Sequence, residues 1–144
     1  MAEPTGAREA EAGDIPWERL FQAAGEARTR AHAPYSRFPV GAAALYADGA
    51  IVTGCNVENA SYGLTICAER SAIARAVVEG HEGLRALAIV VDTPVPCPPC
   101  GMCRQVVAEF GRPSLPVRSR TLKGDEARYT LQELLPHAFT AGFL

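Results

Sequence analysis

The residues of this chain best suited to chemistry are its five cysteines, three of which lie within seven residues. Cys97, Cys100 and Cys103 stand in the segment CPPCGMC and form two overlapping Cys-x-x-Cys pairs. An odd number of cysteines in a chain without an apparent secretory signal favours a metal or catalytic role over a disulfide framework. The segment therefore raises the question of which pair is used.

The residues between the cysteines distinguish the two pairs. Two prolines separate Cys97 from Cys100, and they stiffen the backbone and remove two N–H donors. Gly101 and Met102 instead leave their amides free at the start of an expected helix. Free amides and the positive end of a helix dipole stabilise thiolates, which are the form that binds metal. Cys100 and Cys103 are therefore the better pair.

A catalytic zinc site takes three protein ligands and leaves the fourth position to water. Cys67 begins a second expected helix, so it offers a third thiolate under the same conditions. Cys55 and Cys97 then stay outside the site. The histidines lack ligand spacing to any cysteine and are interpreted as surface or packing residues: His32, His81 and His137.

Two charged residues follow Cys67. Arg70 lies in the first turn of its helix and could donate hydrogen bonds to ligand sulfurs. Spacing alone fits Glu69 equally to a proton shuttle beside a metal and to a partner of the helix dipole. A structural zinc knuckle would need four protein ligands and gives Glu69 no role, and redox exchange through the Cys100 pair needs a thioredoxin-like context that is missing.

Helices and a sheet must position these residues. Helical spacing of apolar residues begins at Trp17 and extends to about His32, and Asp48-Gly49 predicts a tight hairpin turn. The further expected elements are strands at 41–47, 51–57, 84–92 and 115–121 and helices at 67–78, 103–110 and 131–135. This order predicts an α/β fold with a mixed sheet covered by helices on both faces. We expect a flexible tail at 1–14 and a single domain at 15–144.

Composition indicates which classes of partner and which cellular location to expect. Hydrophobic residues make up 48% of the chain and charged residues 21%, with a formal net charge of -2 and no basic cluster. A nucleic-acid partner is not expected, because such binding needs concentrated positive charge. The chain has no apolar run near the roughly 18 residues of a membrane span and no signal-like start, which favours a cytoplasmic protein without a membrane partner.

Five segments together resemble a known family. They are PYSRFPVGAA (34–43), GCNVENASYG (54–63), CAER (67–70), PCGMCRQV (99–106) and LLPHAF (134–139). In this order they are similar to the homotetrameric zinc-dependent cytidine deaminases of the cytidine and deoxycytidylate deaminase superfamily. The family often has Ser or Thr where this chain has Pro98, and Cys97 is not a family ligand. The resemblance implies a three-layer α/β/α cytidine deaminase-like fold.

The resemblance also assigns roles to residues. It implies one Zn²⁺ per chain held by Cys67, Cys100 and Cys103, with Glu69 as proton shuttle and Arg70 neutralising thiolate charge. The substrate contacts that it implies are Phe38 on the pyrimidine, the Ala68 backbone on O2 of the base, and Asn56 and Glu58 on the ribose 3′-hydroxyl. It further implies active sites shared between subunits of a homotetramer, with Phe139 in a neighbour's site and Tyr62 near a subunit boundary.

The function implied is hydrolytic deamination of cytidine and 2′-deoxycytidine to uridine and 2′-deoxyuridine, with release of ammonia, in pyrimidine salvage. The partner is then a small nucleoside. Two alternatives remain: deamination of free base or another cytosine compound such as blasticidin S, and a non-catalytic zinc-binding module.

Overall fold

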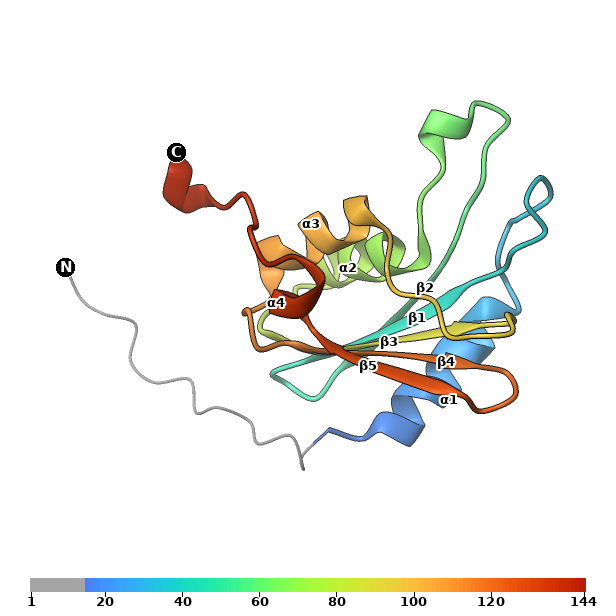
Figure 1. Cartoon of the computed structure of the whole chain (residues 1–144), viewed down its shortest axis with the longest axis horizontal. Coiled ribbons are helices and arrows are strands. Elements are labelled where there is room, and N and C mark those ends of the chain that lie inside the picture. The colour runs from blue at the N-terminus through green and yellow to red at the C-terminus, as the bar shows by residue number, and fades with distance from the viewer. Residues whose placement is uncertain (1–14) are drawn as a thin grey trace.

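A mixed sheet forms the centre of the computed structural model, which describes residues 15–144 (Figure 1). Its strands are β1 (Gly41–Tyr46), β2 (Ile51–Cys55), β3 (Leu84–Val91), β4 (Pro116–Thr121) and β5 (Glu126–Thr130). Their order in the sheet is β2-β1-β3-β4-β5. β1 pairs antiparallel with β2 and β3, β3 runs parallel to β4, and β4 pairs antiparallel with β5. The prediction of a mixed sheet is confirmed.

Helices cover both faces of this sheet. They are α1 (Trp17–Arg28), α2 (Ala68–Val78), α3 (Gly101–Phe110) and α4 (Leu131–Leu134), with short 3₁₀ helices η2 (Tyr62–Leu64) and η3 (Ala141–Phe143). Figure 1 shows α1 on one face and α2 and α3 side by side on the other. The predicted three-layer α/β/α fold is therefore confirmed, while the expected tail at 1–14 lies outside the described residues. Within residues 15–144, every helix is too short or too polar to cross a lipid bilayer.

Alternating side chains of β1 supply both halves of the core. Ala42 and Ala44 belong to the cluster under α2 and α3, while Ala43 and Leu45 belong to the cluster under α1. Successive side chains of a strand point to opposite faces, so one apolar strand serves both layers. A glycine brings α2 close to the sheet, because a Cβ on Gly54 would lie 2.5 Å from the Ala68 carbonyl oxygen. This contact fixes the first turn of α2.

The crossover from β3 to β4 places two helix starts together. α3 connects the parallel strands β3 and β4, so it begins beyond the carboxyl end of β3. α2 begins at the same end, since the sulfur atoms of Cys67 and Cys100 lie 3.7 Å apart. In α/β sheets this end is where ligands bind. The fold therefore brings the first turns of α2 and α3 to a common place.

Two boundaries differ from the sequence-based expectation. α1 ends at Arg28 rather than near His32, because the His32 amide donates to the Asn56 carbonyl oxygen and its own carbonyl accepts from Glu58 N. This pairing with a distant segment removes His32 from the helix. The edge strand β5 was not expected, because its sequence EARYT has little apolar patterning.

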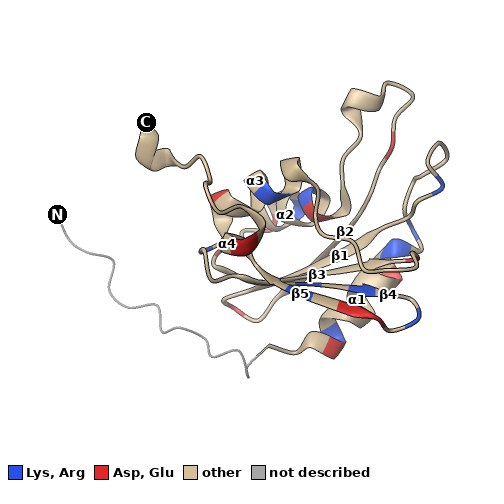
Figure 2. Ribbon diagram, viewed as in Figure 1, with Lys and Arg blue, Asp and Glu red and all other residues tan. Residues whose placement is uncertain are grey.

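Ion pairs join the β4–β5 edge to α1. Arg120 on β4 bonds both carboxylate oxygens of Glu18, at 2.9 and 2.7 Å, and Glu126 on β5 at 2.9 Å. Figure 2 shows basic and acidic residues interspersed over this region. The Arg120 guanidinium also lies 3.8 Å from the centre of the Phe21 ring, so it covers apolar surface of α1. Charged side chains therefore complete the packing where the sheet extends past α1.

Candidate active site

Helix starts position the three cysteines predicted as ligands. Cys67 is the N-cap of α2, Cys100 is the N-cap of α3, and Cys103 lies in the first turn of α3. The first amides of a helix have no partner within the helix, and the helix dipole adds positive potential there. Negative charge on these sulfurs is therefore stabilised by two helices at once.

The spacing of the sulfur atoms fits a tetrahedral ion. The Sγ atoms of Cys67, Cys100 and Cys103 all lie within 4.8 Å of one another, and the Cys67 and Cys100 sulfurs are 3.7 Å apart. Zn–S bonds of about 2.3 Å in a tetrahedron separate two sulfurs by about 3.8 Å. In the described part of the chain no other three His, Cys, Asp or Glu residues come together in this way. Three thiolates of this geometry are suitable donors for zinc.

The remaining cysteines lie apart from this group. Cys97 is half-buried against the core cluster under α2 and α3, and burial raises the pKa of its thiol. Cys55 ends β2. The structure thus brings together the three cysteines chosen from the sequence and leaves out the two set aside.

Hydrogen bonds favour a thiolate at Cys67. The pKa of Cys67 is lowered to about 5, first because the Cys103 thiol donates to its sulfur and then because Arg70 does so. Arg70 Nη2 lies 3.6 Å from Cys67 Sγ and 3.4 Å from the Thr65 carbonyl oxygen. The hydrogen bond between Cys103 and Cys67, together with burial, raises the pKa of Cys103. Arg70 therefore lies where it can offset negative charge on the sulfur group.

Glu69 is a buried carboxylate beside the sulfur group. The residue is only 5% exposed, and its Oε2 atom lies 3.7 Å from Cys103 Sγ. Burial raises the pKa of this carboxyl group. A carboxylate that served only the helix dipole could remain in water, so burial toward the sulfurs favours the proton-shuttle interpretation over the alternative that spacing left open.

Asn56 holds the loop that carries Phe38. Its buried side chain accepts a hydrogen bond from Val40 N and donates one to the Phe38 carbonyl oxygen, both at 2.8 Å. The sequence did not predict this positioning role. The signal for it was a polar amide side chain directly after the strand β2. Asn56 thus fixes the backbone on both sides of Pro39.

Glu58 holds the same loop from its other end. Its Oε1 atom accepts hydrogen bonds from Tyr35 N at 3.0 Å and Ser36 N at 3.1 Å. Hydrogen bonding from Ser36 lowers the pKa of Glu58, so the group stays a carboxylate at neutral pH. Asn56 and Glu58 therefore both bind the backbone of residues 35–40, a segment about 20 residues earlier in the chain.

The other predicted substrate residues differ in exposure. Ala68, the first residue of α2, is fully buried, and Phe38 is 37% exposed. Tyr62 is 74% exposed and contacts Tyr35 edge-on, with ring centres 5.9 Å apart. Phe139 is 59% exposed and stacks on Phe143 at 5.6 Å. Within one chain, two aromatic residues of the predicted site thus remain largely open to water.

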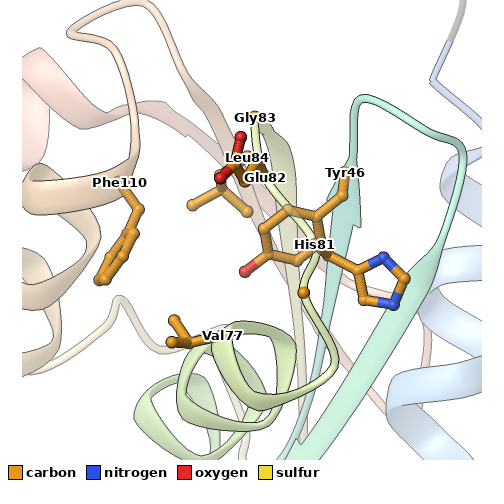
Figure 3. A pocket seen from close by; sticks show the side chains of 8 residues that line it. Tyr46, Val77, His81, Glu82, Gly83, Leu84 and Phe110 are labelled. Carbon is orange, nitrogen blue, oxygen red and sulfur yellow. The ribbon is translucent and has the colours of Figure 1, made fainter.

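A cavity of about 310 Å³ lies at the opposite ends of α2 and α3 (Figure 3). Tyr46, Val77, His81, Leu84 and Phe110 are among its lining residues. It contains none of the predicted site residues. The candidate site is therefore the sulfur group at the helix starts and not this cavity.

Comparison with known proteins agrees with the geometry. Residues 16–118 match the family model described as the cytidine and deoxycytidylate deaminase zinc-binding region. The chain belongs to this family. Zinc is accordingly the cofactor of this deaminase, in agreement with the thiolate donors present.

Similar proteins cover most of the chain. A cytidine deaminase of Sporosarcina psychrophila is 51% identical over 85% of this chain and 90% of its own length. One of Mycobacterium tuberculosis strain H37Rv is 48% identical over 88% and 91%. The crystal structure of cytidine deaminase from Burkholderia pseudomallei superposes with a TM-score of 0.83, at 46% identity, over 87% of this chain and all of that chain. A non-catalytic zinc module is therefore not the interpretation that the comparisons favour.

Proposed function

We propose that this deaminase converts cytidine and 2′-deoxycytidine to uridine and 2′-deoxyuridine with release of ammonia. The observation that carries the proposal is a buried carboxylate, Glu69, 3.7 Å from a sulfur of a three-cysteine group in a family domain that binds zinc. The similar proteins named cytidine deaminases support cytidine as the substrate. One zinc ion per chain would be held by Cys67, Cys100 and Cys103.

The residues of the site divide the chemistry among them. A bound zinc ion supplies Lewis acidity, which makes hydroxide available from water near neutral pH. Glu69 accepts the proton of that water and later delivers protons to N3 of the base and to the departing amine. Its burial, which raises the pKa of the carboxyl group, makes this carboxylate a stronger proton acceptor than an exposed one. The oxygen of water adds to C4 of the base, and the C4–N bond then breaks to release ammonia.

Charge around the sulfurs is offset by the protein. Three thiolates carry one more negative charge than a divalent ion neutralises, and a buried excess of charge is costly. Arg70, with its Nη2 atom 3.6 Å from Cys67 Sγ, and the first turns of α2 and α3 supply positive potential. Arg70 therefore acts as the charge-neutralising residue of the site.

Substrate contacts follow from the loop that Asn56 and Glu58 hold. We infer that Phe38 packs against the pyrimidine, that the Ala68 backbone contacts O2, and that Asn56 and Glu58 bind the ribose 3′-hydroxyl. Their hydrogen bonds to residues 35–40 support this, because they link the sugar-binding groups to the backbone that presents Phe38. Both sugars carry a 3′-hydroxyl, so both nucleosides would be accepted.

Changing Glu58→Ala is expected to reduce kcat/KM for cytidine and 2′-deoxycytidine about equally, by about ten- to a hundredfold. The reason is that both substrates lose the same hydrogen bond to the 3′-hydroxyl. Steady-state kinetics with 3′-deoxycytidine separates this loss from loop disorder. That analogue should be a poor substrate for the wild type. Glu58→Ala should reduce its kcat/KM less than that of cytidine, because the analogue loses only the effect of the loop contacts to Tyr35 and Ser36. Efficient turnover of the analogue by the wild type would refute the ribose role, and Glu109→Ala on the exposed surface is the matched control.

We also infer a homotetramer with shared active sites. Phe139, Phe143 and Leu144 are 59, 72 and 98% exposed, and Figure 1 shows the C-terminal segment projecting from the body. Exposed aromatic residues that gather on a surface typically mark a protein contact. Phe139 would then enter a neighbour's substrate site, with Tyr62 near the boundary. Residues 15–144 would form one domain in each subunit.

Deleting residues 139–144 is expected to raise KM for cytidine by about threefold to tenfold, because an aromatic contact with the neighbour's substrate is lost. Zinc content should not change. A shorter deletion of residues 141–144 keeps Phe139 and should retain most of the affinity. Light scattering that found an active monomer, or an unchanged KM after the longer deletion, would contradict shared sites.

The direct test of the proposed function is an ultraviolet assay with cytidine, paired with a zinc count per chain. Loss of cytidine absorbance with about one zinc per chain supports the proposal. Turnover of blasticidin S or free cytosine but not cytidine would change the substrate, and zinc without turnover would favour a structural module. A role in pyrimidine salvage follows from the reaction. Thiolate ligands must stay reduced, which supports a cytoplasmic location.

A further inference from the structure

Arg104 forms hydrogen bonds to two segments that are distant in the sequence, and it has no role in the proposed reaction itself. It follows Cys103 in α3, and its guanidinium Nε donates to the Pro99 carbonyl oxygen at 2.8 Å. Its Nη1 atom donates to the Leu134 carbonyl oxygen at 2.9 Å. Pro99 directly precedes Cys100, while Leu134 is the last residue of α4. One side chain therefore links the cysteine loop to the C-terminal part of the chain.

The positions of the Pro99 and Leu134 carbonyl oxygens favour arginine over lysine in this link. Pro99 and Leu134 are buried residues, and the carbonyl at the end of a helix has no partner within that helix. The arginine fork holds its N–H groups in a fixed plane, so it can satisfy two carbonyls in set directions at once. A lysine would keep the charge but offers a single flexible donor group.

α4 is a firmly held unit at the other end of the link. Thr130 and Glu133 form a reciprocal capping box at its start. The Leu131 amide donates to the Leu115 carbonyl oxygen, and the Gln132 amide donates to that of Pro113. Beyond α4, Gln105 Nε2 bonds the Phe139 carbonyl oxygen at 2.8 Å. Adjacent residues of α3 thus hold both α4 and the segment that follows it.

We propose that Arg104 is a positioning residue that couples the zinc loop to α4, so that metal binding at Cys100 and the order of α4 stabilise each other. The proposal rests on the proposed ligation by Cys100. Coupling of this kind is reciprocal: whatever weakens α4 must weaken zinc binding through Arg104, although α4 contributes no ligand. The same link would fix the position of Phe139, which follows α4, relative to the metal site of its own subunit.

A double-mutant cycle in zinc affinity tests the coupling. The four full-length proteins are wild type, Arg104→Lys, Glu133→Ala and the double variant, each titrated with zinc against a chelator. We expect Arg104→Lys to weaken zinc binding by about tenfold, as changes beside metal ligands typically do. Glu133→Ala, which removes the remote capping box, should weaken it by about two- to fivefold in the wild type and not at all in the Arg104→Lys background.

Gln105→Ala is the matched control, because it removes only the bond to Phe139 and should leave zinc affinity unchanged. The absorption bands of the cobalt-substituted protein give a second measure, and Arg104→Lys should shift them as Cys100 moves. Unchanged zinc affinity in Arg104→Lys, or an equal effect of Glu133→Ala in both backgrounds, overturns the proposal. If Arg104→Lys does not fold, wild-type zinc affinity in Glu133→Ala overturns it. None of these measurements needs turnover, so a chain inactive on cytidine would refute the proposed function without affecting this test.

Discussion

Replacing Glu69 by glutamine is expected to cut kcat for cytidine by at least roughly 10³-fold while zinc stays bound. Glutamine keeps the shape of the side chain but can neither accept the proton of water nor deliver it to the base. No proposed ligand changes, and a neutral amide costs less to bury than a carboxylate, so the fold should remain intact. The measurements are steady-state kinetics, zinc content and thermal unfolding.

The contrast with other carboxylates sharpens this prediction. Glu69 is buried 3.7 Å from Cys103 Sγ, whereas Glu109 on α3 is exposed. Glu109→Gln should therefore leave kcat unchanged. Wild-type activity in Glu69→Gln would show that the buried carboxylate serves packing or the helix dipole alone.

Loss of a single proposed ligand is expected to have the second large effect. Cys100→Ser or Cys103→Ser should lower zinc affinity by orders of magnitude and abolish turnover, because the site then keeps only two thiolates. The free energy of unfolding should also fall, since metal that binds only the folded chain stabilises it. Zinc analysis after dialysis against a chelator, together with denaturant unfolding, measures both effects.

Cys97→Ser is the matched control for these variants. Cys97 lies three residues before Cys100, yet it packs against the core outside the sulfur group. Its replacement should keep the full zinc content and activity, with only a modest loss of stability. If Cys97→Ser lost its zinc while Cys100→Ser kept it, the choice of pair from the two prolines would be wrong.

Local signals in the sequence predicted most elements of the fold. Asp48-Gly49 indicated the hairpin, the apolar run before Thr93 indicated the buried strand β3, and the helix formers after Cys67 indicated α2. These signals act over a few residues and need no knowledge of distant contacts. The strand β5 has no such signal, because it lies at the sheet edge and its Glu126 is held there by ion pairs with Arg118 and Arg120.

The sequence by itself determined the chemical type of the site. Cysteines at two expected helix starts specified thiolate ligands, and the residues around them favoured Cys67, Cys100 and Cys103 over Cys55 and Cys97. The reason is that electrostatic stabilisation by a helix start is a local property of the chain.

Only the tertiary structure decided which groups meet. It set the sulfur atoms within 4.8 Å of one another, buried Glu69 beside them, and joined Asn56 to the backbone of Phe38 and Val40. It also placed Arg104 between Pro99 and Leu134, which are 35 residues apart in the sequence. Such contacts depend on how the sheet brings distant segments together, and no pattern within a few residues carries that information.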